Sequence, residues 1–390
     1  MSRLATRLRL PQRDGTLVLF EPGPAGVFDR PQRALQSRVA IAAAHVVADP
    51  LAENIPGGPA RLDWDLTLAY RRHLWSWGLG VAEAMDTAQR GAGLDWPVAA
   101  ELIRRSLHEA REAGGHVVCG VGTDQLPAGS ARSLADIERA YEEQCAEVEA
   151  EGGQVVLMAS RELARIASGP DDYARVYGRI LGRLSRPAII HWLGDAFDPA
   201  LAGYWGSAEL DRATTSCLDI IAANRERVDG VKVSLLDAEQ EIEMRRRLPA
   251  GVRMYTGDDF NFPSLIEGDE RGHSDALLGI FDAIAPAASA ALQALDAGEL
   301  ALYRERLAPT VALSRHIFQT PTSNYKTGVV FMAYLNGHQR HFRMVGAQEG
   351  MRSVLHLSEL FRLADRAGLF PDLELAVDRM RCFLALAGVD

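Results

Sequence analysis

Asp229-Gly-Val-Lys-Val-Ser-Leu235 is a short apolar run of the kind that forms a buried β-strand. Side chains alternate between the two faces of a strand, so its aliphatic residues should face one side, and Gly230, Lys232 and Ser234 the other. In a barrel the aliphatic face packs on the surrounding helices. We therefore expect Lys232 to point into the barrel, near its mouth.

Similar short apolar runs recur along the chain, and the segments between them carry apolar residues at spacings of three and four, as amphipathic helices do. Together with the segment above, the runs cover 39–46, 79–85, 116–121, 154–159, 188–193, 230–236, 253–256 and 276–281. Eight strands that alternate with helices predict an α/β fold, a (β/α)8 TIM barrel with additional C-terminal helices. An open doubly wound sheet is the main alternative.

The chain has 390 residues, more than the roughly 250 of a minimal barrel, and its pattern is purely helical beyond Pro286. We expect an N-terminal extension over residues 1–36, the barrel over 37–298 and a helical layer packed on it over 299–390.

The composition narrows the possible partners. A net charge of −10 without a basic face argues against nucleic-acid binding. No apolar stretch of about 20 residues is present, so we expect a cytoplasmic protein that does not bind a membrane. The 4 cysteines lack a C-x-x-C spacing, which argues against a disulfide framework or a structural zinc site.

Only Lys232 and Lys326 among the 42 basic residues are lysine, and the others are arginine. An interior lysine loses hydration, so its pKa should fall and its free amine could attack a carbonyl carbon. Arginine cannot do this, because its guanidinium stays protonated. The alternative for Lys232 is a structural ion pair, for example with Asp258. For Lys326 we expect a solvated surface position.

The motifs Gly230-Val-Lys-Val-Ser234 and Thr256-Gly-Asp-Asp259 resemble the sixth-strand lysine and seventh-strand Gly-Asp-Asp motifs of the dihydrodipicolinate synthase and N-acetylneuraminate lyase family. Gly120-Val-Gly-Thr123 is similar to that family's third-strand turn, and 276–286 to its eighth strand. The resemblance implies a (β/α)8 barrel with C-terminal helices and Lys232 as the nucleophile. It further implies a covalent imine without a separate cofactor, and a homo-oligomer, either a dimer or a tetramer.

The chain also departs from that family. Ala84-Met-Asp-Thr-Ala-Gln89 replaces the Gly-Thr-Thr-Gly-Glu segment that holds the carboxylate of a 2-oxo acid, and Asp86 would repel such a carboxylate. The fifth-strand tyrosine that relays protons would fall at His191. Histidine can serve as acid and base near neutral pH, although a hydrogen-bonded structural histidine is the alternative.

Our leading functional prediction is a Schiff-base-forming lyase or hydro-lyase, aldolase-like, that acts on a small ketone, aldehyde or sugar-derived keto acid. Its candidate catalytic residues are Lys232 as nucleophile, His191 as proton shuttle and Asp258 as the carboxylate that orients the lysine or binds substrate hydroxyls, with Asp259 as the alternative for that role. Further residues at the ends of strands are candidates for substrate binding. They are Asp86, Thr87, Gly122, Thr123, Ser234, Asp259 and His273.

Two other functions stay open. A metal-dependent sugar isomerase or aldolase could hold a divalent cation through Glu83, Asp86, His191 and Asp258. A non-catalytic sensor of a small molecule could use the same barrel, because fold alone does not imply catalysis.

Overall fold

The computed structural model describes residues 7–389. The chain divides into two compact units. The barrel unit comprises Arg38–Ala44 and Leu79–Gly279, and the helical unit comprises the chain up to Ser37, His45–Gly78 and the chain from Ile280 onward.

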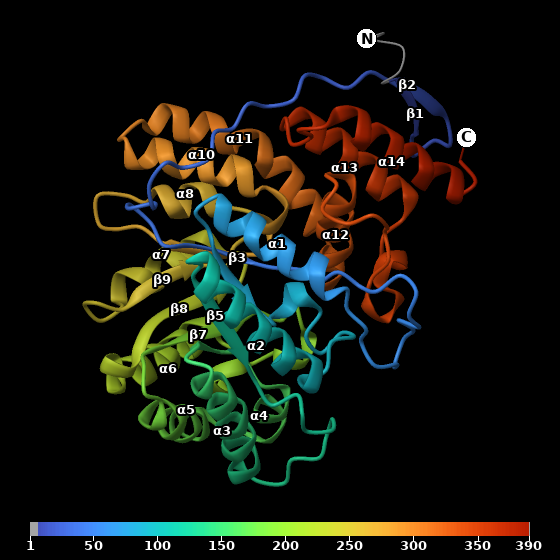
Figure 1. The fold of residues 1–390 in the computed structure, drawn as a ribbon. Coiled ribbons are helices and arrows are strands. Elements are labelled where there is room, and N and C mark those ends of the chain that lie inside the picture. The colour runs from blue at the N-terminus through green and yellow to red at the C-terminus, as the bar shows by residue number, and fades with distance from the viewer. Residues whose placement is uncertain (1–6, 390) are drawn as a thin grey trace. The chain divides into compact units, whose positions relative to one another are not determined.

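The barrel unit is built on a closed barrel of eight parallel strands, in the order β10-β3-β4-β5-β6-β7-β8-β9 (Figure 1). These strands are β3 (Ala40–Ala43), β4 (Gly80–Glu83), β5 (Val117–Val121), β6 (Gln154–Leu157), β7 (Ala188–Leu193), β8 (Val228–Ser234), β9 (Arg253–Thr256) and β10 (Asp275–Leu278). Each overlaps one of the runs read from the sequence. The expected (β/α)8 barrel is therefore confirmed, and the open sheet is wrong.

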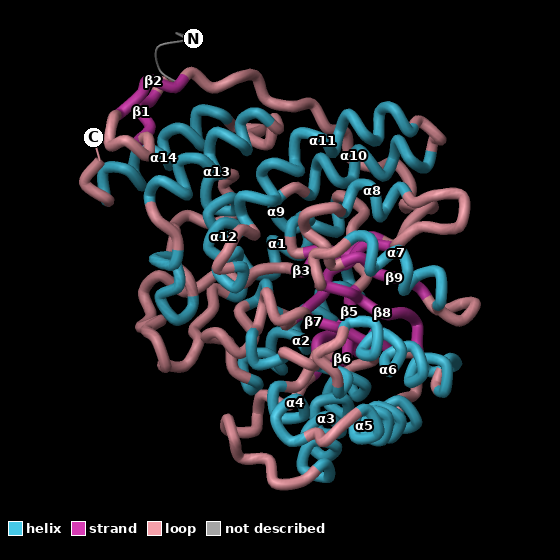
Figure 2. The backbone as a smooth tube through the Cα atoms, turned by 180° about the vertical axis from the view of Figure 1, so that it is seen from behind, coloured by secondary structure: helices cyan, strands magenta, loops and turns pink. Residues whose placement is uncertain are grey.

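Helices follow the strands from β4 to β9 and pack around them, with the strands gathered inside (Figure 2). They are α2 (Trp96–Ala113), α3 (Leu134–Ala150), α4 (Arg161–Ile166), α5 (Pro170–Arg183), α6 (Leu210–Ala223), α7 (Ala238–Arg247) and α8 (Phe262–Glu267). Local sequence sets their ends. Ser133 and Asp136 form a capping box at the start of α3, and Gly114 adopts φ +68° at the end of α2.

The interior of the barrel contains an apolar cluster. Its buried members are Ile41, Ala43, Ala82, Met85, Val118, Val156, Met158, Ile189, Tyr255 and Leu277. Gly230 on β8 leaves room for the Tyr255 ring, since a Cβ at position 230 would lie 2.6 Å from it. The Tyr255 hydroxyl donates to the Asp229 carboxylate at 2.6 Å. Gly230 and its alternate neighbours on β8 thus face the interior, as the sequence predicted.

The helical unit contains an antiparallel hairpin and most of the C-terminal third of the chain. Its elements are β1 (Leu8–Pro11), β2 (Leu17–Phe20), α1 (Trp64–Ser76), α9 (Ile280–Ala283), α10 (Ala285–Asp296), α11 (Leu300–Ile317), α12 (Tyr325–Leu335), α13 (Val354–Arg366) and α14 (Leu373–Leu386). Helix α11 packs on α10 and α13, and α12 on α9 and α14. Strand β1 contacts α13. Among the described residues, no helix is both long and apolar enough to cross a membrane.

The surface position expected for Lys326 is wrong. Its side chain lies in the first turn of α12, a helix whose residues are all buried, and it is 7% exposed. The ammonium donates to the Ser323 carbonyl oxygen at 3.1 Å and lies 5.0 Å from the centre of the Tyr325 ring. The expectation failed because α12 is apolar on all sides and therefore interior.

Glu241 on α7 should make the stability of the protein depend on pH. Burial raises the pKa of this carboxyl to about 8, against contacts with Ser274 and Thr256 that lower it. In the unfolded chain this carboxyl has its ordinary pKa of 4.5. The stability that the neutral form contributes is therefore fully present below pH 4.5 and is lost as the pH rises through the folded-state pKa of about 8. We expect unfolding by urea to show a loss on the order of a few kcal/mol over this window.

Glu241→Gln should remove that part of the pH dependence, because the amide does not ionise. Glu243→Gln, on the exposed side of the same helix, is the matched control and should behave as the parent. Parallel stability curves for Glu241→Gln and the parent between pH 5 and 8 would contradict the prediction.

Candidate active site

Lys232 lies in the middle of β8 with a side chain that is 7% exposed. It is in register with His191 on β7 and with Tyr255 on β9. Neighbouring residues in register on parallel strands point to the same face of the sheet, and Tyr255 belongs to the interior cluster. The lysine therefore points into the barrel.

The charge of Lys232 is unfavourable in this position. Burial lowers the pKa of its amine, and the Asp86 and Asp259 carboxylates oppose that shift without cancelling it. Within residues 7–389, Lys232 makes no ion pair with a carboxylate. At a given pH, a larger fraction of Lys232 is therefore in the neutral, nucleophilic form than of an exposed lysine.

The glycine of the Thr256-Gly-Asp-Asp259 motif lies against the side chains of the lysine strand, β8. A Cβ at position 257 would lie 2.2 Å from the Ser234 hydroxyl oxygen and 2.8 Å from Lys232 Cε. Only glycine lets β9 approach β8 so closely at this level. Because Gly257 lies close to both side chains, Lys232 and Ser234 are on the same face of β8, inside the barrel.

His191 is fully buried beside this pair. Its Nε2 lies 3.3 Å from the Ser234 hydroxyl oxygen, and its Nδ1 has no hydrogen-bond partner. Burial and the nearby charge of Lys232 hold the pKa of His191 well below its usual value. The imidazole is therefore neutral at physiological pH, with one nitrogen able to accept a proton.

A cavity of about 290 Å³ opens at the carboxyl ends of β4 to β7. Asp86, Gly122, Thr123 and His191 from the predicted set line it. Lys232 and Ser234 do not line it themselves. Both lie close to residues that line the cavity: Ser234 contacts His191, and the Asp86 carboxylate raises the pKa of Lys232. We call this space the barrel cavity.

Asp258 does not take the position expected for it. Its carboxylate accepts hydrogen bonds from the backbone N–H groups of Phe260 and Asn261, at 2.8 and 3.0 Å, and from the Asn261 side chain at 2.8 Å. These bonds fix the turn that leads into α8. The carboxylates that act on Lys232 are those of Asp86 and Asp259.

His273 is not brought to the site. It precedes β10, and in a parallel barrel all strands begin at the face opposite the one where they end. The other predicted residues lie at the correct face, and Thr87 is buried in a 3₁₀ turn of residues Asp86–Ala88.

No group of three or more His, Cys, Asp or Glu side chains within residues 7–389 is arranged to hold a metal ion. The set Glu83, Asp86, His191 and Asp258 is therefore not assembled as a ligand sphere. Glu83 is fully buried, and its carboxylate accepts from the backbone N–H of Ala84 at 3.2 Å.

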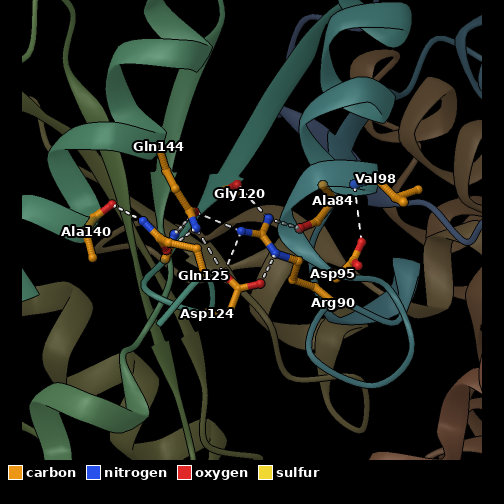
Figure 3. A network of polar contacts seen from close by, with 10 residues as sticks. Ala84, Arg90, Asp95, Val98, Gly120, Asp124, Gln125, Ala140 and Gln144 are labelled. Carbon is orange, nitrogen blue, oxygen red and sulfur yellow. Dashed lines mark hydrogen bonds and ion pairs between the residues drawn. The ribbon is translucent and has the colours of Figure 1, made fainter. Parts of the chain in front are cut away.

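Sequence reasoning missed a polar network that frames the barrel cavity (Figure 3). Arg90 donates to both carboxylate oxygens of Asp124, at 2.6 and 2.7 Å, and to the Gln144 side-chain oxygen at 2.8 Å. It also donates to the carbonyl oxygens of Ala84 and Gly120, both at 3.2 Å. Arg90 thus ties the ends of β4 and β5 to α3.

Gln144 completes this network from α3. Its side-chain oxygen also accepts from the Gly122 N–H at 2.6 Å, and its amide donates to the Gln125 side-chain oxygen at 2.6 Å. Burial would raise the pKa of Asp124, but its bonds with Arg90 and Gln144 lower it overall. The one sequence signal was a glutamine on the buried face of an amphipathic helix, beside Tyr141 and Cys145.

Replacing Arg90 should destabilise the barrel unit. Arg90→Gln leaves the Asp124 carboxylate half-buried without its cation, which typically costs about 3–5 kcal/mol. Arg104→Gln, which removes an exposed pair with Glu101 on α2, should cost less than about 1 kcal/mol. Chemical denaturation of the two variants measures both values. Equal losses would show that the Arg90 network does not hold the strand ends together.

The fold and this site define a (β/α)8 barrel with a buried lysine on its sixth strand, next to a cavity at the carboxyl ends of the strands. Solved structures show the same fold. A putative dihydrodipicolinate synthetase from Pseudomonas aeruginosa matches with a TM-score of 0.63 and 14% identity, over 85% of this chain and 99% of that one. Dihydrodipicolinate synthase from Thermotoga maritima matches with 0.62 and 15%, over 86% and 100%.

A third similar structure is a prophage protein of the dihydrodipicolinic acid synthase family from E. coli K12, solved in complex with pyruvate. It has a TM-score of 0.62 and 15% identity, over 85% of this chain and 99% of that one. The resemblance read from the motifs is thus confirmed at the level of the fold. The chain belongs to the family described as "Protein of unknown function (DUF993)", whose model matches residues 8–389. No curated protein matches the sequence.

Proposed function

We propose that this protein is a Schiff-base-forming lyase or hydro-lyase, aldolase-like, in which Lys232 attacks the carbonyl carbon of a small ketone or aldehyde. The observation that carries the proposal is the buried amine of Lys232, whose pKa is lowered by burial and which forms no ion pair within the described chain. The likeness of the fold to dihydrodipicolinate synthases supports the same class of chemistry.

The reaction begins when the neutral amine forms a C–N bond with the carbonyl carbon and the carbonyl oxygen takes up a proton. Loss of that oxygen as water gives a protonated imine. The imine nitrogen then accepts the electron pair of the bond that breaks, which leaves an enamine. The bond is either a carbon–carbon bond, whose far fragment leaves as a carbonyl compound after its hydroxyl group gives up a proton, or a C–H bond next to the imine, whose proton passes to a base. The enamine becomes an imine again by taking up a proton at carbon in the lyase reaction, or by expelling a β-hydroxyl group as water in the hydro-lyase reaction. Hydrolysis of the imine releases the product and restores the amine.

His191 and Ser234 are the groups we assign to proton transfer. The neutral imidazole contacts the Ser234 hydroxyl at 3.3 Å, so the two can pass a proton between them. Asp259 replaces Asp258 as the carboxylate that orients Lys232, because Asp259 acts on its charge while Asp258 holds the turn before α8. Since Lys232 does not line the barrel cavity, its flexible stem must swing toward it for attack.

The barrel cavity favours an uncharged, hydroxylated substrate. Asp86 lines it with a carboxylate, and the Thr123 and Ser160 hydroxyls, 2.6 Å apart, offer hydrogen bonds to substrate hydroxyl groups. Arg161 also lines the cavity but is paired with Asp198. A small sugar-like ketone or aldehyde fits these groups better than pyruvate, and a sugar-derived keto acid would have to place its carboxylate near Arg161.

Further expectations accompany this proposal. Catalysis needs no cofactor beyond the imine at Lys232, and the candidate partner is the small carbonyl substrate. We also propose a cytoplasmic location and a homo-oligomer, with the barrel domain over residues 37–298.

Borohydride trapping tests the nucleophile directly. Dihydroxyacetone, glyceraldehyde and pyruvate are each incubated with the protein and reduced, and the adduct is located by peptide mass spectrometry. The expected result is a mass increase on the peptide that contains Lys232, absent in Lys232→Gln. The chain helps here, because Lys326 is the only other lysine.

Lys326→Arg is the matched control, since it removes the other buried lysine and keeps the charge. Its adduct yield should equal that of the parent. Failure of all three carbonyl compounds to label Lys232, or equal labelling of Lys326, would defeat the proposal.

Asp86→Asn should change both the substrate preference and the pH dependence of trapping. Removing a like charge should raise the yield of the pyruvate adduct by about tenfold, equivalent to roughly 1.4 kcal/mol. Asp86 raises the pKa of Lys232, so the variant should reach half-maximal labelling at a lower pH. Asp195→Asn, exposed after β7 and outside the cavity, should change neither. An unchanged pyruvate yield in Asp86→Asn would refute the assigned role of Asp86.

A further inference from the structure

A second cavity, of about 250 Å³, lies wholly within the helical unit. It is lined by residues of α1, α9 and α12, by the turn after α12, and by the loops around Phe28 and Leu369. None of its lining residues lines the barrel cavity. We call it the imidazole pocket, because His73 and His338 both line it, with their rings in contact and the ring centres 4.2 Å apart.

Its polar residues are held by a buried network. The Asp282 carboxylate lies 2.9 Å from His45 Nδ1 and 2.7 Å from the His45 backbone nitrogen, which donates to it. The Tyr70 hydroxyl lies 3.0 Å from the same carboxylate. Asp282 is thus supplied with hydrogen-bond donors, and it is 2% exposed.

Both imidazoles of the pocket are uncharged at physiological pH. Burial lowers the pKa of His73 to about 4 and that of His338 to about 3. Neither ring makes a hydrogen bond with another residue in the described part of the chain. A neutral imidazole offers one donor and one acceptor, so together the rings provide both kinds of group.

Two further lining residues carry buried polar atoms without a partner. They are the Trp77 indole nitrogen, a donor, and the Asn336 side-chain oxygen, an acceptor. Leaving such buried atoms unpaired is unfavourable, and a bound molecule that hydrogen-bonds to them removes that cost. The pocket therefore contains an unmatched hydrogen-bond donor and an unmatched acceptor.

The walls favour a flat molecule. Tyr70 packs with its ring centre 5.0 Å from that of His338 and 5.5 Å from that of His73, and Phe28 and Trp77 add two more aromatic surfaces. A cation is disfavoured because the Arg30 guanidinium already lies over Trp77, 5.5 Å from its ring. An anion is disfavoured by Asp282 in the lining. The volume, below the roughly 300–1,000 Å³ of drug-sized pockets, fits one or two fused rings.

We propose that the imidazole pocket is a second ligand site, separate from the barrel cavity, that binds a small uncharged nitrogen heteroaromatic molecule. The rings of His73, His338 and Tyr70 stack on it, while Trp77 and Asn336 hydrogen-bond to its edge. The proposal is independent of the chemistry assigned to Lys232.

Calorimetry on the full chain tests this, with adenine as the uncharged heteroaromatic probe, benzoate as an anionic ring and tetramethylammonium as a cation. We expect saturable binding of adenine at one site per chain, and none of the other two compounds. Lys232→Gln should bind adenine like the parent, which separates this site from the proposed enzymatic one.

Conservative variants locate the site. Trp77→Phe keeps an aromatic ring but removes the indole donor, and Asn336→Leu keeps the shape of the side chain but removes the amide oxygen. Each should weaken adenine binding by about fivefold or more, the effect of one lost hydrogen bond. Trp75→Phe, on the same helix and outside the pocket, is the matched control and should not change the affinity. Thermal melts of the unliganded variants check that each is folded.

Absence of adenine binding, equal binding of benzoate, or unchanged affinity in both folded pocket variants would each overturn the proposal.

Discussion

The closed barrel imposes one constraint on which the candidate site depends: the amine of Lys232 must exist away from water. Burial disfavours its ammonium form, and the Asp86 and Asp259 carboxylates restore that form in part. The pKa of the amine is lowered overall, which favours the neutral form more than in an exposed lysine. The same amine also affects its neighbour, because its charge helps to keep His191 neutral. Burial of the imidazole, first of all, and the charge of Lys232 therefore lower the pKa of His191.

The backbone around Lys232 is arranged to make this possible. Gly230 admits the Tyr255 ring below the lysine, and Gly257 admits the lysine stem and the Ser234 hydroxyl beside it. Above them, Arg90 holds the loops after β4 and β5 together through Asp124 and Gln144. These contacts hold the carboxyl ends of the strands in place, which is where a parallel barrel carries its functional residues.

The helical unit follows a different principle. Beside Arg30 and Asp282, its pocket is lined by neutral imidazoles, aromatic rings and unpaired amide and indole groups. Within residues 7–389, the barrel cavity is lined by several carboxylates, hydroxyls and arginines, with His191 as its one histidine. Two cavities with such different chemistry are suited to different molecules. A chain with two kinds of site can combine catalysis at one with recognition at the other.

The sequence by itself determined the eight strands, their order and the inward direction of Lys232, because strand periodicity and the scarcity of lysine are local properties of the chain. Tertiary structure decided the rest. It separated Asp258 from Asp259, placed His273 at the opposite face and buried Lys326. It also brought Arg90 to Gln144, and His73 to His338, across long stretches of sequence. Periodicity cannot report such contacts, since each depends on how distant segments pack together.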